Sequence, residues 1–246
     1  MEMEENEAQV QAYEKLYKSG QYAQLLRDTD PPQTPEQCYF RGLGFQEIKQ
    51  FDESLDCFRK VYPYRASFPD LEYNLGLAYF YKEDYASSVK HFENFLRVHP
   101  SNTSIYHETA MVLYLSSRWQ DVCELCERAM DWRVKRIPTR FWALAQLQLG
   151  QIQPAHTKLI QALETEESAG LWDALGDVLL VAGHPKEATQ AYCTAQEKGF
   201  RDLKKVAIPT ASGTVLDLGP QLLPRDPSGL QKPRHSMCEA SGCAGF

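Results

Sequence analysis

The sequence predicts an all-α array of stacked helix–turn–helix repeats, and the main evidence is a series of small residues at a fixed spacing. The spacing is 34 residues for the first two steps and 33 for the last two. The members of this series are Gly42, Gly76, Ala110, Ala143 and Gly176. A fixed period of this length is typical of a repeat array, and 34 residues is the length of a helix–turn–helix unit.

Three more series keep the same register, and each fills one type of position in every unit. A second small or medium-sized position is held by Ser54, Ser88, Val122, Ala155 and Ala188. Two apolar positions follow, at Phe58, Phe92, Cys126, Leu159 and Tyr192, and at Val61, Phe95, Ala129, Ala162 and Ala195. Their spacings of four and three residues place them on one helical face. A unit this small cannot bury that face alone, so the units must stack.

The helices can be placed from this register and from proline and glycine. We expect five pairs, at 36–49 and 52–61, 70–82 and 85–97, 103–116 and 119–131, 138–149 and 152–165, and 170–182 and 185–198. A bulky residue or proline follows the turn inside each pair, at Phe51, Tyr85, Trp119, Ile152 and Pro185. Pro63 and Pro69 predict a loop between the first two pairs.

The residues in these series resemble the tetratricopeptide repeat pattern, W-x2-L-G-x2-Y, then A-x3-F, then P. The best matches are Trp172, Leu175, Gly176, Ala188 and Tyr192, and then Leu75, Gly76, Tyr79, Ser88, Phe92 and Pro100. The resemblance implies a right-handed superhelical solenoid over residues 35–202. Its repeats would be 35–68, 69–102, 103–135, 136–168 and 169–202, after an atypical capping helix pair at 1–34. The Pro/Gly-rich tail at 203–246 is predicted to be disordered.

Composition excludes several functions. The net charge is −7, with −9 on residues 1–202 and +2 on residues 203–246, so an acidic body argues against a nucleic-acid partner. No apolar run is long enough to span a membrane, and the acidic start lacks the features of a signal peptide. Seven cysteines, an odd number, indicate reduced thiols and a cytoplasmic protein, with the nucleus as an alternative.

No catalytic, metal or cofactor site is expected. Cys123 and Cys126 form a C-x2-C pair without a second pair, which favours packed thiols over a zinc site. Asp173 and Asp177 lie one helical turn apart and are interpreted as a solvated acidic face. Cys243 stands four residues from the end, but Gly245 fits poorly where prenylation needs an aliphatic residue. We therefore expect a protein that is not an enzyme and has no cofactor.

The resemblance places a peptide-binding groove along the first helix of each pair. The expected groove residues are Tyr39, Leu43, Tyr73, Leu77, Phe80, Tyr81, His107, Met111, Tyr114 and Arg140, with Leu144, Asp173 and Asp177 at its charged end. Alternatively, Phe80, Tyr81 and Leu115 simply pack between adjacent repeats. Family members that bind chaperone tails ending in EEVD use Lys, Asn and Arg side chains. Only Asn74 matches here, and Glu108 stands where a cation is needed, so no such clamp is expected.

Two functions remain open at this stage. The first is a scaffold or adaptor, as a subunit of a larger assembly, that binds a protein or peptide segment in the groove. The second is a co-chaperone or holdase that shields apolar segments of many clients. No polar capping helix is evident after Phe200, so we expect the last repeat to expose an apolar face that a partner or self-association covers.

Overall fold

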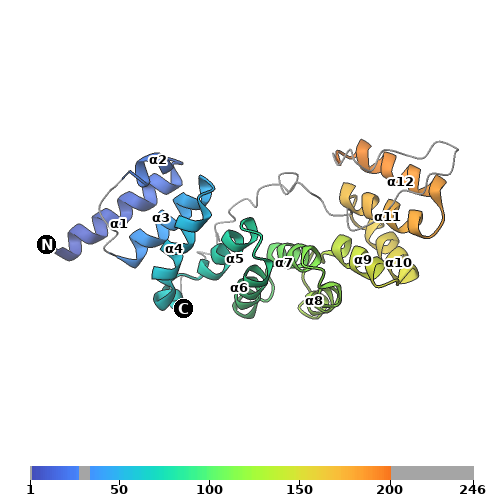
Figure 1. The fold of residues 1–246 in the computed structure, drawn as a ribbon, viewed down its shortest axis with the longest axis horizontal. Helices are drawn as coiled ribbons and strands as arrows, with labels where there is room; N and C mark the ends of the chain where they lie inside the picture. The colour runs from blue at the N-terminus through green and yellow to red at the C-terminus, as the bar shows by residue number, and fades with distance from the viewer. Residues whose placement is uncertain (1, 28–33, 201–246) are drawn as a thin grey trace, which may run out of the picture. The chain divides into compact units, whose positions relative to one another are not determined.

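A computed structural model describes residues 2–27 and 34–200, and within those ranges every regular element is a helix (Figure 1). The described residues divide into two compact units, one up to Ala145 and the other from Gln146. The expected disordered tail at 203–246 and the end of the capping pair at Asp30-Pro31-Pro32 lie outside the described residues.

The first unit contains the helices α1 to α8, most of α9 and one 3-10 helix, η1. Their bounds are α1 Glu2–Lys18, α2 Tyr22–Leu25, α3 Pro35–Glu47, α4 Phe51–Val61, η1 Tyr62–Ser67, α5 Leu71–Tyr81, α6 Tyr85–Val98, α7 Thr103–Leu115, α8 Trp119–Asp131 and α9 Thr139–Gln148. In each pair we call the first helix A (α3, α5, α7) and the second helix B (α4, α6, α8). Each B helix packs on the A helix of its own pair, and α4 and α6 also contact the A helix that follows.

The second unit contains the end of α9 and the helices α10 Ile152–Leu163, α11 Ala169–Val181 and α12 Pro185–Glu197. Here α11 packs on both α10 and α12, as an A helix packs on its two neighbouring B helices. The unit therefore contains one complete pair, α11 and α12, preceded by the B helix α10.

The predicted helix pairs are confirmed to within a few residues at each end. The bulky residues expected after each turn are the first residues of the B helices α4, α6, α8, α10 and α12. One expectation was wrong, because Pro63 and Pro69 do not bracket an irregular loop. Residues Tyr62–Ser67 form η1, whose tighter turn accommodates Pro63 at its start.

The turn inside each pair has the same backbone geometry throughout. The second residue after the A helix has a positive φ, at Lys49, Glu83, Ser117, Gly150 and Gly183. The next N–H then donates back to the helix, as from Gln50 N to Phe45 O (2.9 Å) and from Asp84 N to Tyr79 O (3.0 Å). This is the left-handed C-terminal cap that glycine favours, so three of the five turns hold a residue that is strained there.

Close contact between the A and B helices explains the small residues of the first series. A Cβ added at Gly42, Gly76 or Gly176 would lie 2.5, 2.5 and 2.3 Å from the ring of Phe58, Phe92 and Tyr192, respectively. The two pairs with alanine at this position carry the smaller residues Cys126 and Leu159 instead. Both of those are fully buried. The pairs with Gly42, Gly76 and Gly176 thus match the size of one residue to that of its partner.

The last pair differs from two expectations. Helix α12 buries Ala188, Ala191, Tyr192 and Ala195 against α11, and its outward residues are mostly polar. Val181 is the one large hydrophobic residue that the described part of this pair leaves exposed. The expected apolar face at the last repeat was therefore wrong for the described residues, because the periodicity of α12 turns its apolar side inward.

Asp173 and Asp177 do not form the solvated face that their spacing led us to expect. Both side chains are only 2% exposed, and the hydroxyl of Tyr192 donates to Asp177 Oδ1 at 2.8 Å. Spacing alone placed the two carboxylates on one side of α11, but it could not show that α12 supplies Tyr192 to cover that side. The charged end expected for the groove is correspondingly absent at these two positions.

Candidate functional site

The ten expected groove residues from Tyr39 to Arg140 belong to the first unit, and they differ widely in exposure. Five are buried, namely Leu43, Leu77, Phe80, Met111 and Tyr114. Four are half-buried, namely Tyr39, Tyr73, His107 and Arg140. Tyr81 is 42% exposed. Much of the apolar surface expected in the groove is therefore used for packing, and the accessible part is aromatic and polar.

Hydrogen bonds connect α3 to α5 on the A-helix side. Asn74 donates from Nδ2 to the hydroxyl of Tyr39 (3.0 Å) and to the carbonyl of Asp70 (2.9 Å). Gln46 donates from Nε2 to the carbonyl of Asn74 at 2.8 Å. Asn74 is buried, and burial is the main cause that raises the pKa of Tyr39. The one residue that matched the EEVD clamp thus has its amide engaged in contacts between repeats.

A second polar contact connects α5 to α7. The hydroxyl of Tyr73 lies 3.3 Å from Glu108 Oε1. The other carboxylate oxygen, Oε2, is buried and has no hydrogen-bond partner among the described residues. Burial raises the pKa of Glu108 to about 7, although the bond from Tyr73 acts in the opposite direction. Sequence reasoning used Glu108 only to exclude the EEVD clamp and did not predict this buried carboxyl.

Tyr81 is held in place by a ring from the preceding pair. Its ring stacks on Phe51, with the centroids 4.9 Å apart and the planes 10° from parallel. Phe80 meets Tyr81 edge-on at 5.3 Å. Burial raises the pKa of Tyr81, and the charges of Glu108 and Glu47 raise it further, so the phenol lies within electrostatic reach of both.

The third part of the predicted groove surrounds Phe141 on α9. The ring of Tyr114 lies 6.2 Å from that of Phe141, and the guanidinium of Arg140 lies 5.7 Å from the same ring. Arg140 therefore covers an aromatic face. The structure brings this group together within the first unit, separately from Tyr39 and Asn74 on α3 and α5.

Comparison with known proteins tests the fold. No family model and no curated protein matches the sequence. Solved structures do match, among them a thermophilic tetratricopeptide repeat protein of Thermus thermophilus. That match has a TM-score of 0.53 and 18% identity, and covers 69% of this chain and 94% of the other. The fold is that of the tetratricopeptide repeat proteins.

Two further matches have the same fold at similarly low identity. A tetratricopeptide repeat protein from Parabacteroides merdae has a TM-score of 0.53 and 15% identity, and covers 78% of this chain and 74% of its own. MamA from Desulfovibrio magneticus RS-1 has a TM-score of 0.56 and 15% identity, and covers 68% of this chain and 95% of its own. The tetratricopeptide repeat fold predicted from the spacing is confirmed.

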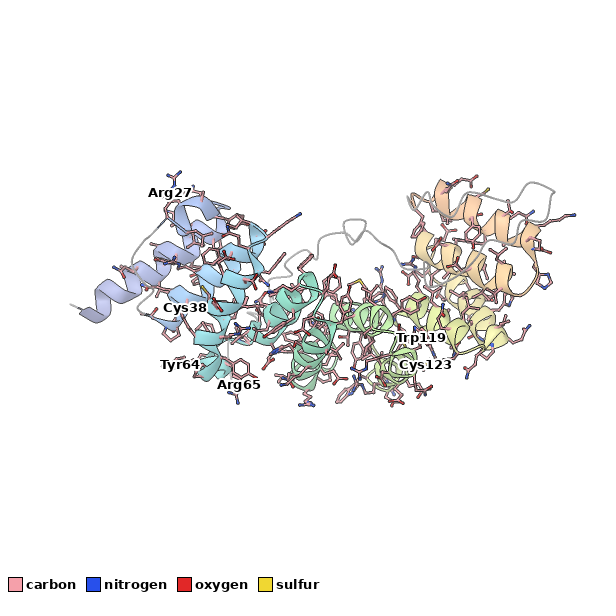
Figure 2. All side chains as sticks on the ribbon, in the orientation of Figure 1. Arg27, Cys38, Tyr64, Arg65, Trp119 and Cys123 are labelled. Atoms are coloured by element: carbon pink, nitrogen blue, oxygen red, sulfur yellow. The ribbon has the colours of Figure 1, made fainter. Side chains whose placement is uncertain are left out.

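The cysteines of this tetratricopeptide repeat fold pack as small apolar residues. Cys38, Cys57, Cys123 and Cys126 are buried and Cys193 is exposed, and all five are free. Burial raises the pKa of Cys57 to about 11, and it raises the pKa of Cys126 as well. Within 2–27 and 34–200, no group of three or more metal-ligating side chains could hold an ion. Cys38 and Cys123, on α3 and α8, are labelled in Figure 2.

An exposed apolar series lies on the first unit, outside the residues expected from the sequence. Tyr64, Val98 and Trp132 are 55%, 72% and 56% exposed, and they are spaced by 34 residues. Each lies at or just beyond the end of a B helix, and Figure 2 labels Tyr64 beside Arg65 on η1. The repeat period itself was the signal that could have found them.

A hollow lies away from the A helices. It has a volume of about 390 Å³, lies along α8, and includes Glu93 of α6. Two ion pairs lie along it, since Arg128 lies 4.0 Å from Glu93 and Arg118 bonds to Asp121. Exposed ion pairs of this kind contribute little free energy. In the part of the chain that the structure describes, no helix is both long and apolar enough to cross a bilayer.

Proposed function

We propose that the chain is a non-enzymatic scaffold or adaptor that binds a protein segment along α3, α5 and α7, as a subunit of a larger assembly. The stacking of Tyr81 on Phe51 is the observation that best supports this proposal. An exposed aromatic side chain that neighbouring repeats already hold in place loses little entropy on binding. Tyrosine is also a residue type that carries binding energy in protein interfaces.

The exposure of the groove residues favours an adaptor over a holdase. A holdase needs an extended apolar surface for unrelated clients. Leu43, Leu77 and Met111 are buried instead. What remains accessible is a set of phenol, imidazole and guanidinium groups, and such groups favour selected partners.

The free thiols support a reducing compartment. Four of the five described cysteines are buried and unpaired, and a protein that folded in an oxidising environment would be at risk of wrong pairing. We therefore place the adaptor in the cytoplasm, as a proposal that fractionation of native cells would test.

The test is affinity purification of the full chain from native cells, with partners identified by mass spectrometry. Tyr81→Glu is the variant of choice, because Leu77 is buried and a charge there would disturb the fold. Tyr64→Glu is the matched control, since Tyr64 is an exposed tyrosine on η1. We expect Tyr81→Glu, but not Tyr64→Glu, to lose a few stoichiometric partners, with both variants helical by circular dichroism.

The control also tests the location of the interface. Loss of the same partners only in Tyr64→Glu would place the interface at the ends of the B helices and overturn the proposal. Many substoichiometric partners, all lost in Tyr81→Glu, would favour the holdase.

A further inference from the structure

The buried carboxyl of Glu108 points to the chemistry of the partner, and this inference rests on the function proposed above. Glu108 accepts one hydrogen bond, from Tyr73, and no described cation pairs with it. Its Oε2 is buried without a partner among the described residues. Folded proteins rarely leave a buried polar atom unpaired, and such an atom calls for an explanation.

The surroundings of Glu108 suit a cation and repel an anion. One phenol, that of Tyr73, bonds to the carboxyl, and the phenol of Tyr81 lies within electrostatic range of it, because the charge of Glu108 raises the pKa of Tyr81. A second carboxylate, that of Glu47, acts on the same phenol. Aromatic faces attract ammonium and guanidinium groups, and a carboxylate adds a charge-assisted hydrogen bond.

The group is accessible from solvent through Tyr81. This ring is 42% exposed and Glu108 as a residue is half-buried, but its Oε2 is covered, so a bound side chain reaches that oxygen only if a covering side chain moves aside. A lysine or arginine has the required length, because its aliphatic stem can lie on the tyrosine while the charged end reaches inward.

We propose that Glu108, flanked by Tyr73 and Tyr81, receives a lysine or arginine side chain of the partner segment. The cation donates to Oε2 and rests against the two phenol rings. The partner is accordingly a basic peptide segment, and the acidic body of the chain, with a net charge of −9 over residues 1–202, assists its approach.

The test begins with a random library of 12-residue peptides, selected on the full chain and counter-selected against the Tyr81→Ala variant, which removes the ring without adding a charge. We expect the peptides that depend on Tyr81 to share one lysine or arginine. One such peptide is then compared with its norleucine analogue, which keeps the stem and removes the charge. The norleucine analogue should bind wild type at least ~10-fold more weakly than the lysine peptide does. The Glu108→Gln variant, by contrast, should bind the norleucine analogue and the lysine peptide equally well.

The outcomes separate this inference from the proposed function. Peptides that depend on Tyr81 but lack a shared basic residue, or whose lysine is indifferent to Glu108→Gln, would overturn the cation site and leave the adaptor intact. Failure to select any peptide that depends on Tyr81 would overturn both. Enrichment of acidic peptides would contradict the cation site directly. Glu124→Gln, an exposed change on α8, is the control for a general loss of negative charge.

Discussion

Gly76 lies directly beneath the ring of Phe92, so closely that a Cβ at residue 76 would come within 2.5 Å of two ring carbons. Phe92 is almost fully buried, so a shift of its ring would disturb the close packing around it. We expect Gly76→Ala to destabilise the fold by roughly 1–3 kcal/mol, because overpacking forces the helices apart. Urea denaturation monitored by circular dichroism measures this change.

The same contact predicts a rescue. Phe92→Leu removes the ring carbons that a Cβ at residue 76 would meet. The double variant Gly76→Ala with Phe92→Leu should be more stable than the sum of the two single changes predicts, by about 1 kcal/mol or more. Additive effects would show that the Gly76 contact does not limit the helix spacing.

The turns inside the pairs predict stabilising substitutions. Lys49, Glu83 and Ser117 adopt positive φ angles of 63°, 61° and 58°. Glycine at each position should raise the free energy of unfolding by roughly 0.5–1 kcal/mol, since the left-handed conformation costs a side-chain-bearing residue about that much. Thermal unfolding of each single variant checks this. Gly150→Ala is the reciprocal control, because nothing lies within 4 Å of the added Cβ and only the backbone term remains.

Two buried serines of one series should respond differently to removal of the hydroxyl. Ser88 Oγ donates to the carbonyl of Gly76 at 2.8 Å, whereas Ser54 Oγ has no hydrogen-bond partner among the described residues. Ser88→Ala should cost about 1 kcal/mol, and Ser54→Ala should be neutral or stabilising. Equal losses in chemical denaturation would indicate that Ser54 makes a bond of similar strength.

Glu108 predicts a pH-dependent stability. Its pKa in the folded chain, about 7, lies above the ordinary value of 4.5, so the folded chain holds this proton more tightly than the unfolded chain. The contribution of Glu108 is complete below pH 4.5 and is lost as the pH rises through 7. Glu108→Gln keeps a partner for Tyr73 without a charge. The substitution should therefore change the free energy of unfolding more favourably at pH 8 than at pH 4.5, by roughly 1–3 kcal/mol.

The measurement is the free energy of unfolding of wild type and Glu108→Gln at several pH values between about 4.5 and 8. Burial is the dominant cause of the shift, and the Tyr73 hydroxyl is the hydrogen-bond partner that the described residues give the carboxyl. Glu124→Gln serves as the exposed control. A difference between wild type and Glu108→Gln that stays constant with pH would show that Glu108 titrates normally.

The sequence predicted the helix pairs well because their packing depends on one residue type at one spacing. In two of these contacts, Gly42 with Phe58 and Gly176 with Tyr192, the partners are sixteen residues apart within one repeat. Their pairing therefore follows from the period. Burial of a side chain by a neighbouring repeat is harder to predict. The period placed Leu77 and Met111 in the groove, but it could not show how deeply the neighbouring helices cover them.

The candidate site was only partly predictable for the same reason. Tyr73 and Tyr81 were identified from their place on α5, but the bond from Tyr73 to Glu108 joins residues 35 apart on two A helices. No pattern in the sequence shows that a carboxyl will lose its solvent there. Likewise, the solvated face expected at Asp173 and Asp177 was wrong, because the covering Tyr192 comes from the following helix.

The five cysteines that the structure describes have a practical consequence for labelling. Four are buried, and Cys193 on α12 is the exposed one within 34–200, so a thiol reagent added to the folded chain meets one reactive position there. With Cys238 and Cys243 of the tail changed to serine, a fluorophore or spin label can be attached at Cys193 without altering the helices. A second label at an exposed position of the first unit would then measure the distance between the two units in solution.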